Sequence, residues 1–121
     1  IGSGEARFEQ RLKRAKKKFR SKLSIAIKPS EDLERKIYAG SDMLVMPSRF
    51  EPCGLSQIIA LRYGTIPVVR GTGGLLDTVK DYNADKKNGN GCIFHEFSKV
   101  SLLDALRRAI SEYEDNKRWK K

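Results

Sequence analysis

The segment from Pro47 to Leu55 reads Pro-Ser-Arg-Phe-Glu-Pro-Cys-Gly-Leu, which places one carboxylate just before a predicted helix. Gly54 permits close approach of the backbone, and the N–H groups of Leu55 and Ser56 would bind a phosphate at the helix start. Glu51 would repel that phosphate, so its carboxylate is better suited to hydrogen-bond sugar hydroxyls or to stabilise a developing cation. The alternative is an acid favoured by the helix dipole, and spacing alone does not decide between the two.

A second glycine-containing segment, Arg70 to Leu75, reads Arg-Gly-Thr-Gly-Gly-Leu. Adjacent glycines before a helix can form another anion-binding turn, although a double glycine is frequently only a turn. A third segment, Gly2-Ser3-Gly4-Glu5, begins like a dinucleotide-binding fingerprint. Arg7 stands where the third glycine belongs, and no ribose-binding acid ends a second strand, so a hydride-transfer enzyme is not expected.

Cysteine and histidine are too few and too scattered for a metal site. Cys53 and Cys92 form neither a CxxC pair nor a disulfide framework, which indicates a reducing compartment. Together with His95 they lack the spacing of a zinc site, and no metal or other cofactor is expected. No base is evident beside Cys53, so we expect it to line the site rather than to act as a nucleophile.

Short apolar runs alternate with helical patterns along the chain. The predicted strands are 23–27, 42–46, 66–69 and 92–94, the predicted helices lie within 5–22, 30–40, 54–63, 75–79 and 100–113, and 81–91 is a polar loop. Ser30 is the predicted N-cap of the second helix, whose buried face would be Leu33 and Ile37. The alternation predicts an α/β fold with a parallel sheet, in which ligands bind beyond the carboxyl ends of the strands.

The chain has 121 residues, which suits one domain, and a net charge of +10. Nine basic and two acidic residues between Glu5 and Lys22 hold +7 of that charge. In the same segment Phe8, Leu12, Ala15 and Phe19 recur on one helical face, which indicates a helix packed on a sheet with a solvated basic face. No aromatic residues alternate with the basic ones, so a nucleic-acid partner is not expected.

Apolar runs in the sequence are all far shorter than the roughly 20 residues that span a membrane. We therefore expect no transmembrane helix and no membrane partner. The first residues lead directly into charge, so no signal peptide is expected either.

Residues 41–57, 60–69 and 72–79 resemble the bacterial glycogen synthase and plant starch synthase family. The most specific stretches are SRFEPCGL at 48–55 and RYGTIPVV at 62–69, and weaker resemblance covers nearly the whole chain. The resemblance implies a retaining glycosyltransferase of the GT-B class, which has two Rossmann-like domains and its active site in the cleft between them. Residues 1–121 would then be a single, partial C-terminal nucleotide-sugar-binding domain, with flanking helices on its sheet and without the N-terminal domain.

The same resemblance implies a reaction and a set of site residues. The family transfers glucose from ADP-glucose, sometimes UDP-glucose, to the 4-hydroxyl at the non-reducing end of an α-1,4-glucan, with retention and without a metal. The implied roles are Glu51 at the reacting centre, Cys53 and Gly54 on the glucose, the Leu55 and Ser56 amides on the distal phosphate, and Thr72, Gly73 and Gly74 along the pocket. The glucan would bind through the missing domain, in the cytoplasm or in a plant plastid.

Three departures from the wider family limit what the chain is expected to do alone. Ile59 stands where related enzymes often carry a ribose-binding Glu, as is usual for the bacterial and plant subfamily, and Lys28-Pro29 replaces a Gly-Tyr pair whose Tyr stacks on adenine. The Arg/Lys pair that neutralises the diphosphate would lie before residue 1. We therefore expect the isolated chain to bind ADP weakly and to transfer no glucose. The alternatives are another retaining glycosyltransferase with a different acceptor, or a non-catalytic nucleotide- or polyanion-binding module that uses the basic helix.

Overall fold

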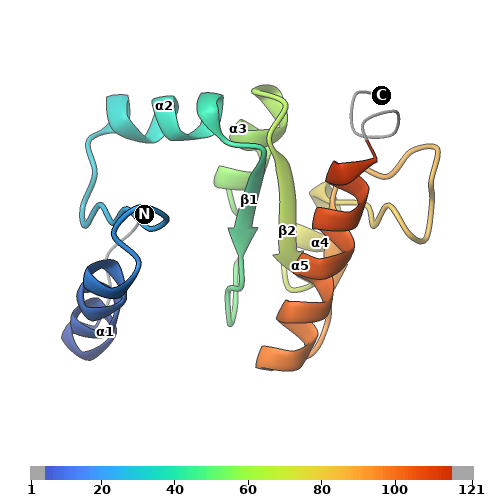
Figure 1. The fold of residues 1–121 in the computed structure, drawn as a ribbon. Coiled ribbons are helices and arrows are strands. Elements are labelled where there is room, and N and C mark those ends of the chain that lie inside the picture. Colours follow the sequence, from blue (N-terminus) through green and yellow to red (C-terminus); the bar gives the residue numbers. More distant parts are fainter. Residues whose placement is uncertain (1–4, 116–121) are drawn as a thin grey trace. The chain divides into compact units, whose positions relative to one another are not determined.

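The computed structural model describes residues 5–115, which divide into two compact units (Figure 1). The helical unit runs up to Ile37, and the sheet unit begins at Tyr38. The helical unit contains α1 (Ala6–Lys18) and most of α2 (Glu31–Gly40), whose last turn belongs to the sheet unit. Gly2, Ser3 and Gly4 of the third glycine-containing segment lie outside the described residues.

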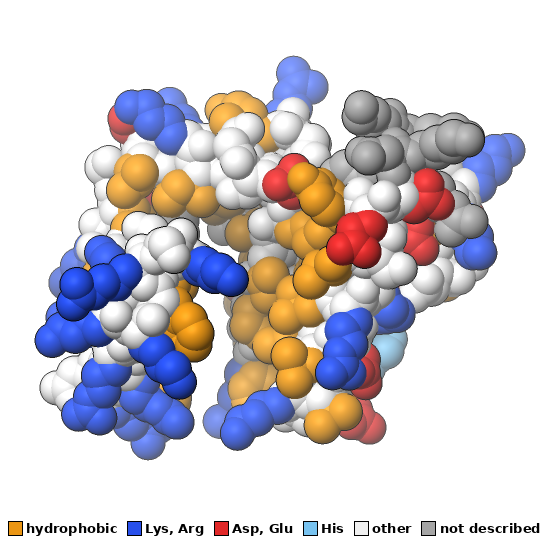
Figure 2. All heavy atoms as spheres, viewed as in Figure 1, with side chains coloured by type: hydrophobic (Ala, Val, Ile, Leu, Met, Phe, Trp, Pro, Cys, Tyr) orange, Lys and Arg blue, Asp and Glu red, His pale blue; other side chains and the backbone are white. Residues whose placement is uncertain are grey.

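Helix α1 confirms the amphipathic helix predicted between residues 5 and 22. Glu9 lies in its first turn and Lys16, Lys17 and Lys18 lie in its last turn, where each charge opposes the helix dipole. Figure 2 shows Lys and Arg side chains gathered over this helix. None of residues 6–18 is buried, and Phe8 and Leu12 on the apolar face are 47% and 49% exposed. The packing of that face on a sheet stays a prediction.

Two predictions in and next to α2 are wrong. Of the strand predicted at 23–27, residues 23–26 belong to no strand, and Ile27 forms only a single β-bridge. Ser30 caps α2 as predicted, with its Oγ accepting from Leu33 N at 3.3 Å. Leu33, however, is 40% exposed, and the buried residue of α2 is Tyr38. Tyr38 belongs to the sheet unit, where Thr65 Oγ1 donates to Tyr38 O at 2.5 Å.

The sheet unit contains a three-stranded parallel sheet in the order β1-β2-β3. Its elements are β1 (Met43–Met46), α3 (Ser56–Arg62), β2 (Ile66–Arg70), α4 (Leu75–Thr78), β3 (Cys92–Phe94) and α5 (Lys99–Glu114). The predicted strands at 42–46, 66–69 and 92–94 are confirmed, and so is the loop at 81–91. The helices agree within two residues at each end. The predicted α/β fold with a parallel sheet is therefore confirmed.

Alternating side chains of β2 and β3 build a core on each face of the sheet. On one face Val68, Cys92 and Phe94 pack with Ala105 and Ala109 of α5. On the other face Val69 and Ile93 pack with Leu75 of α4 and with Val79. Helix α3 packs against β1 and β2 and contacts α4.

The three strands end together at Met46, Arg70 and Phe94 and lead into the loops 47–55, 71–74 and 95–98. The two glycine-containing segments singled out in the sequence thus start at the same edge of the sheet. His95 is exposed in the loop after β3. Within residues 5–115, no helix is both long and apolar enough to cross a membrane.

Candidate active site

The first loop of the site, residues 47–55, joins β1 to α3. Gly54 has φ +67°, a left-handed conformation that favours glycine. Helix α3 begins at Ser56, and its N-cap Leu55 makes no side-chain capping bond. Glu51 is half-buried, whereas Cys53 and Leu55 are exposed. The loop therefore presents side chains of different chemistry around one sharp turn.

The second loop, residues 71–74, lies directly against the first. Gly74 N donates to Glu51 O and to Pro52 O, both at 3.1 Å. A Cβ built on Gly74 would lie 2.5 Å from Cys53 O, and one built on Gly73 would overlap Glu51 O. Gly73 also has φ +49°. Both glycines are required here because two backbones meet with no room for a side chain.

The structure brings the eight residues proposed from sequence into two loops that touch. Glu51, Cys53, Gly54, Leu55 and Ser56 belong to the loop and helix after β1, and Thr72, Gly73 and Gly74 belong to the loop after β2. The arrangement offers a carboxylate, a thiol and a left-handed turn at the carboxyl edge of a parallel sheet, where ligands of such folds bind. Within residues 5–115, no group of three or more His, Cys, Asp or Glu is placed to hold a metal ion.

Sequence reasoning missed Gln57, which lies completely buried on the first turn of α3. Its Nε2 donates to Gly54 O at 2.7 Å, to Thr78 Oγ1 at 3.1 Å and to Cys53 O at 3.2 Å. The available signal was its position three residues before Ala60, which is also completely buried. A polar residue on the buried stripe of a helix indicates a hydrogen-bonding role.

Arg70, at the end of β2, connects the first loop to the loop after β3. Its Nη1 donates to Arg49 O at 3.3 Å, and its guanidinium carbon lies 5.5 Å from the centre of the Phe97 ring. A cation over an aromatic face is a favourable contact. Arg70 therefore supports the loops at the edge of the sheet that carries the candidate site.

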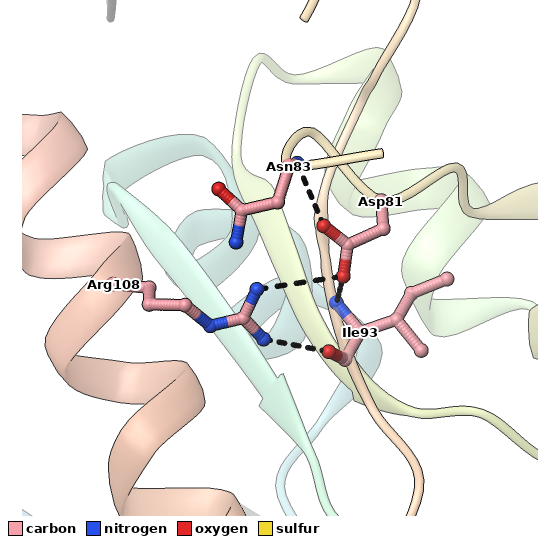
Figure 3. A network of polar contacts seen from close by, with 4 residues as sticks. All are labelled: Asp81, Asn83, Ile93 and Arg108. Atoms are coloured by element: carbon pink, nitrogen blue, oxygen red, sulfur yellow. Dashed lines mark hydrogen bonds and ion pairs between the residues drawn. The ribbon is translucent and has the colours of Figure 1, made fainter. Parts of the chain in front are cut away.

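A second polar cluster, also missed, fastens the loop 81–91 to the sheet and to α5 (Figure 3). Asp81 Oδ2 accepts from Ile93 N at 2.8 Å, and its Oδ1 accepts from Asn83 N at 2.7 Å. Arg108 of α5 donates to Ile93 O at 2.7 Å and lies 3.7 Å from Asp81 Oδ2. One carboxylate and one guanidinium thus hold β3, which carries core residues of both faces.

We expect Asp81→Asn to lower the free energy of unfolding by about 2 kcal/mol, because a charged acceptor of two backbone N–H groups is lost. Urea denaturation followed by circular dichroism measures the change. Asp104→Asn is the matched control, since Asp104 forms an exposed pair with Arg107 at 3.2 Å, and such a change shifts stability by about 0.5 kcal/mol or less. Equal effects of the two substitutions would contradict a structural role for Asp81.

The two thiols are expected to react differently with Ellman's reagent. Cys53 is exposed, whereas Cys92 is buried, and burial, reinforced by Asp81, raises the pKa of the Cys92 thiol. We expect one thiol to react quickly in the folded chain at pH 8 and the second only on unfolding, with Cys53→Ala removing the fast phase. Fast reaction of two thiols in the folded chain would contradict this assignment.

The raised pKa of the Cys92 thiol also predicts that the free energy of unfolding declines as pH rises above about 8.5, where the thiol of the unfolded chain ionises first.

The sequence of the chain matches a known protein family. The family described as "Glycosyl transferases group 1" matches residues 1–121, the whole chain. The chain belongs to the group 1 glycosyl transferases.

Among the relatives of this glycosyl transferase chain are bacterial glycogen synthases. It is 52% identical over 119 residues to the glycogen synthase of Kosmotoga olearia, which covers 98% of this chain and 25% of that protein. It is 50% identical over 121 residues to glycogen synthase 2 of Geobacter metallireducens, which covers 100% of this chain and 25% of that protein. The glycosyl transferase chain described here therefore spans about a quarter of the length of these relatives.

A solved structure shares the fold as well as the sequence. The catalytic domain of starch synthase IV from Arabidopsis thaliana, bound to ADP and acarbose, matches with a TM-score of 0.85 and 37% identity. The match covers 98% of this chain and 25% of that domain. The expected Rossmann-like part of a GT-B enzyme is thereby confirmed for this glycosyl transferase chain.

Proposed function

We propose that this chain is the nucleotide-sugar-binding part of a glycogen or starch synthase. The proposed reaction transfers glucose from ADP-glucose, or UDP-glucose, to the non-reducing end of an α-1,4-glucan with retention of configuration. One observation carries the proposal: the loop containing Glu51 and the Gly73-Gly74 loop contact each other through their backbones at the carboxyl edge of the sheet. The relatives named glycogen synthase and the ADP-bound starch synthase neighbour support the choice of substrates.

In the proposed site, the left-handed turn at Gly54 lies between the residues that would bind the glucose and those that would bind the phosphate. Glu51, Cys53 and Gly54 would face the glucose, and Thr72, Gly73 and Gly74 would line the same pocket. The backbone N–H groups of Leu55 and Ser56 would donate to the distal phosphate, since N–H groups of a first helical turn lack acceptors within their helix. Helix α3 has only seven residues, so these two N–H groups would contribute more than the helix dipole.

The Glu51 carboxylate would stabilise positive charge on the glucose and would not bind the phosphate. As the bond between glucose and phosphate breaks, positive charge develops at the anomeric carbon, and a fixed carboxylate stabilises it. Its backbone is held in place because Gly74 N donates to Glu51 O. The N–H groups of Leu55 and Ser56 would meanwhile stabilise the negative charge that grows on the leaving diphosphate. Separation of these two roles along one loop favours departure of the diphosphate on one side of the sugar.

The rest of the cleft would come from outside residues 1–121. We propose that these residues form one partial C-terminal domain, and that the glucan acceptor and the cations for the diphosphate are bound by other segments. The chain alone is then expected to bind ADP weakly and to transfer no glucose. A bacterial cytoplasmic location is proposed from the bacterial relatives. A plastid location would apply to a plant protein.

The test uses a hybrid synthase, in which this chain replaces the matching 119 residues of the Kosmotoga olearia glycogen synthase. We expect the hybrid synthase to move radiolabelled glucose from ADP-glucose or UDP-glucose into glycogen, with GDP-mannose as the donor control. The unmodified Kosmotoga enzyme controls for the assay. A folded hybrid that transfers nothing, or prefers GDP-mannose, would contradict the proposed function. Transfer by the 121-residue chain alone would contradict the expectation that it is incomplete.

The basic face of α1 favours a second candidate, a module that binds polyanions without catalysis. Lys and Arg residues gather over this helix in Figure 2, and none of its residues is buried. Such binding would fall steeply with salt and would be unaffected by Glu51→Ala. Binding of ADP that weakens on Gly74 substitution at constant salt favours the synthase instead.

A further inference from the structure

The positions of the two site loops depend on one side chain to which the proposed reaction gives no role. We propose that Gln57 is a positioning residue: its side-chain amide fixes the carbonyls of the loop 47–55 and thereby sets where Glu51 stands. This inference rests on the proposed function for its effect on catalysis. Its structural basis lies in the contacts of Gln57 with the first loop and with Thr78, which in turn bonds to Gly74.

Three acceptors surround the side-chain nitrogen of Gln57 and determine how the amide is oriented. Two of them are the backbone carbonyls of Cys53 and Gly54, at 3.2 Å and 2.7 Å. The third is Thr78 Oγ1, at 3.1 Å, and this hydroxyl itself donates to Gly74 O at 3.0 Å. Because the Thr78 proton is committed to Gly74, its oxygen faces Gln57 as an acceptor. A nitrogen is therefore required at this position, and an oxygen there would meet only lone pairs.

These hydrogen bonds, together with those of the Gly74 amide, form a closed ring that joins the two loops. Gly74 N donates to the carbonyls of Glu51 and Pro52, and Gln57 Nε2 donates to those of Cys53 and Gly54. Four consecutive carbonyls of the first loop thus accept from two groups, and Thr78 connects those groups to each other. Loss of the Gln57 donor releases the half of the loop next to Gly54, and only Gly74 then holds Glu51.

Packing alone does not explain an amide at this place. A Cβ on Gly54 would lie 2.5 Å from Gln57 Oε1 and 2.9 Å from Nε2, so the amide occupies the space that a side chain at Gly54 would fill. Within residues 5–115, Oε1 is buried and has no hydrogen-bond partner. An unpaired buried acceptor lowers stability, so an apolar side chain of the same shape would be preferred if filling space were the whole role. The donor on Nε2 is the property that an apolar residue cannot supply.

The experiment compares Gln57→Met and Gln57→Glu in the hybrid synthase. Met keeps the volume and removes the donor, whereas Glu keeps the shape and places a second oxygen against the carbonyls. We expect kcat to fall between about tenfold and 10²-fold for Met, because small misplacements of a catalytic group have effects of that size, and further for Glu. The KM for the nucleotide sugar is expected to change less than kcat. Near-normal kcat in Gln57→Met would overturn the proposal, because it would show that filling the space suffices.

Thr65→Val is the matched control for a merely structural effect. Thr65 is also buried, and its Oγ1 donates to the carbonyls of Tyr38 and Ser41, away from both loops. We expect Thr65→Val to lower the melting temperature of the hybrid synthase at least as much as Gln57→Met, while its kcat stays within about twofold of the parent. Equal losses of kcat in the two variants would overturn the positioning role.

A second measurement remains decisive if the hybrid synthase is inactive or Gln57→Glu does not fold. Hydrogen exchange at the Gly74 amide of the 121-residue chain reports the contact between the loops directly. We expect faster exchange at Gly74 in Gln57→Met than in the parent or in Thr65→Val. Unchanged exchange at Gly74 would overturn the role of Gln57. An inactive hybrid with faster exchange would contradict only the proposed function.

Discussion

Glucosyl transfer by the hybrid synthase is expected to fall on the order of 10³-fold when Glu51 is replaced by Gln. Gln has the same shape but no charge, so the substitution removes the electrostatic stabilisation of the developing cation and leaves the loop packing in place. The loop is held through the Glu51 carbonyl, which accepts from Gly74 N whatever the side chain is. Because the charge matters most in the transition state, kcat should fall while the KM for the nucleotide sugar changes little. Initial rates of glucose incorporation into glycogen measure both constants.

Glu96→Gln is the control for Glu51→Gln. Glu96 is exposed in the loop after β3, at the same edge of the sheet, so its substitution removes the same charge from the same side of the molecule. We expect its kcat to stay within about twofold of the parent, since Glu96 is exposed and the interactions of exposed charges are screened by solvent and salt. If both substitutions lower kcat equally, the effect comes from net charge and not from a fixed carboxylate. A Glu51→Gln enzyme that keeps most of its activity would remove Glu51 from the reaction.

The strands that the sequence predicts correctly are those that pair with one another in one sheet. The apolar runs at Met43–Met46, Ile66–Arg70 and Cys92–Phe94 form strands because each has a neighbouring strand and a helix to cover it. The run at residues 23–27 is also mostly apolar but pairs with none of these strands. Apolar composition shows that a segment can be buried in a sheet. Whether it forms a strand also depends on a partner strand, which can lie far away in the sequence.

In the candidate site too, contacts between residues far apart in the sequence could not be predicted from local patterns. The sequence predicts a turn at Gly73 and Gly74, but their contact with the Glu51–Cys53 carbonyls depends on two loops that meet only in the fold. The sequence also places Gln57 in a helix, but its partner Thr78 is 21 residues away. Local rules identify the turn and the carboxylate. They do not reveal which backbone carbonyls a buried amide will reach.

Gly73→Ala is expected to be the most destabilising of four glycine substitutions that separate backbone strain from steric overlap. Gly40 has open space around its Cβ position and no left-handed backbone, Gly64 has φ +81° and open space, Gly74 has overlap alone, and Gly73 has both overlap and φ +49°. We expect losses in the free energy of unfolding of about 0 kcal/mol for Gly40→Ala and about 1 kcal/mol for Gly64→Ala. Overlap should cost about 3 kcal/mol in Gly74→Ala, and both terms together about 4 kcal/mol in Gly73→Ala.

The order of these four values tests the contact between the loops, because only overlap with the Glu51–Cys53 backbone distinguishes Gly74 from Gly40. Urea denaturation of the 121-residue chain, followed by circular dichroism at 222 nm, measures each value. In the hybrid synthase the same overlap should push the Glu51 loop away, so Gly73→Ala and Gly74→Ala should lose transfer while Gly64→Ala keeps it, although Gly64→Ala is also strained. If Gly74→Ala is as stable as Gly40→Ala, the two loops do not touch, and the proposed site loses its structural basis.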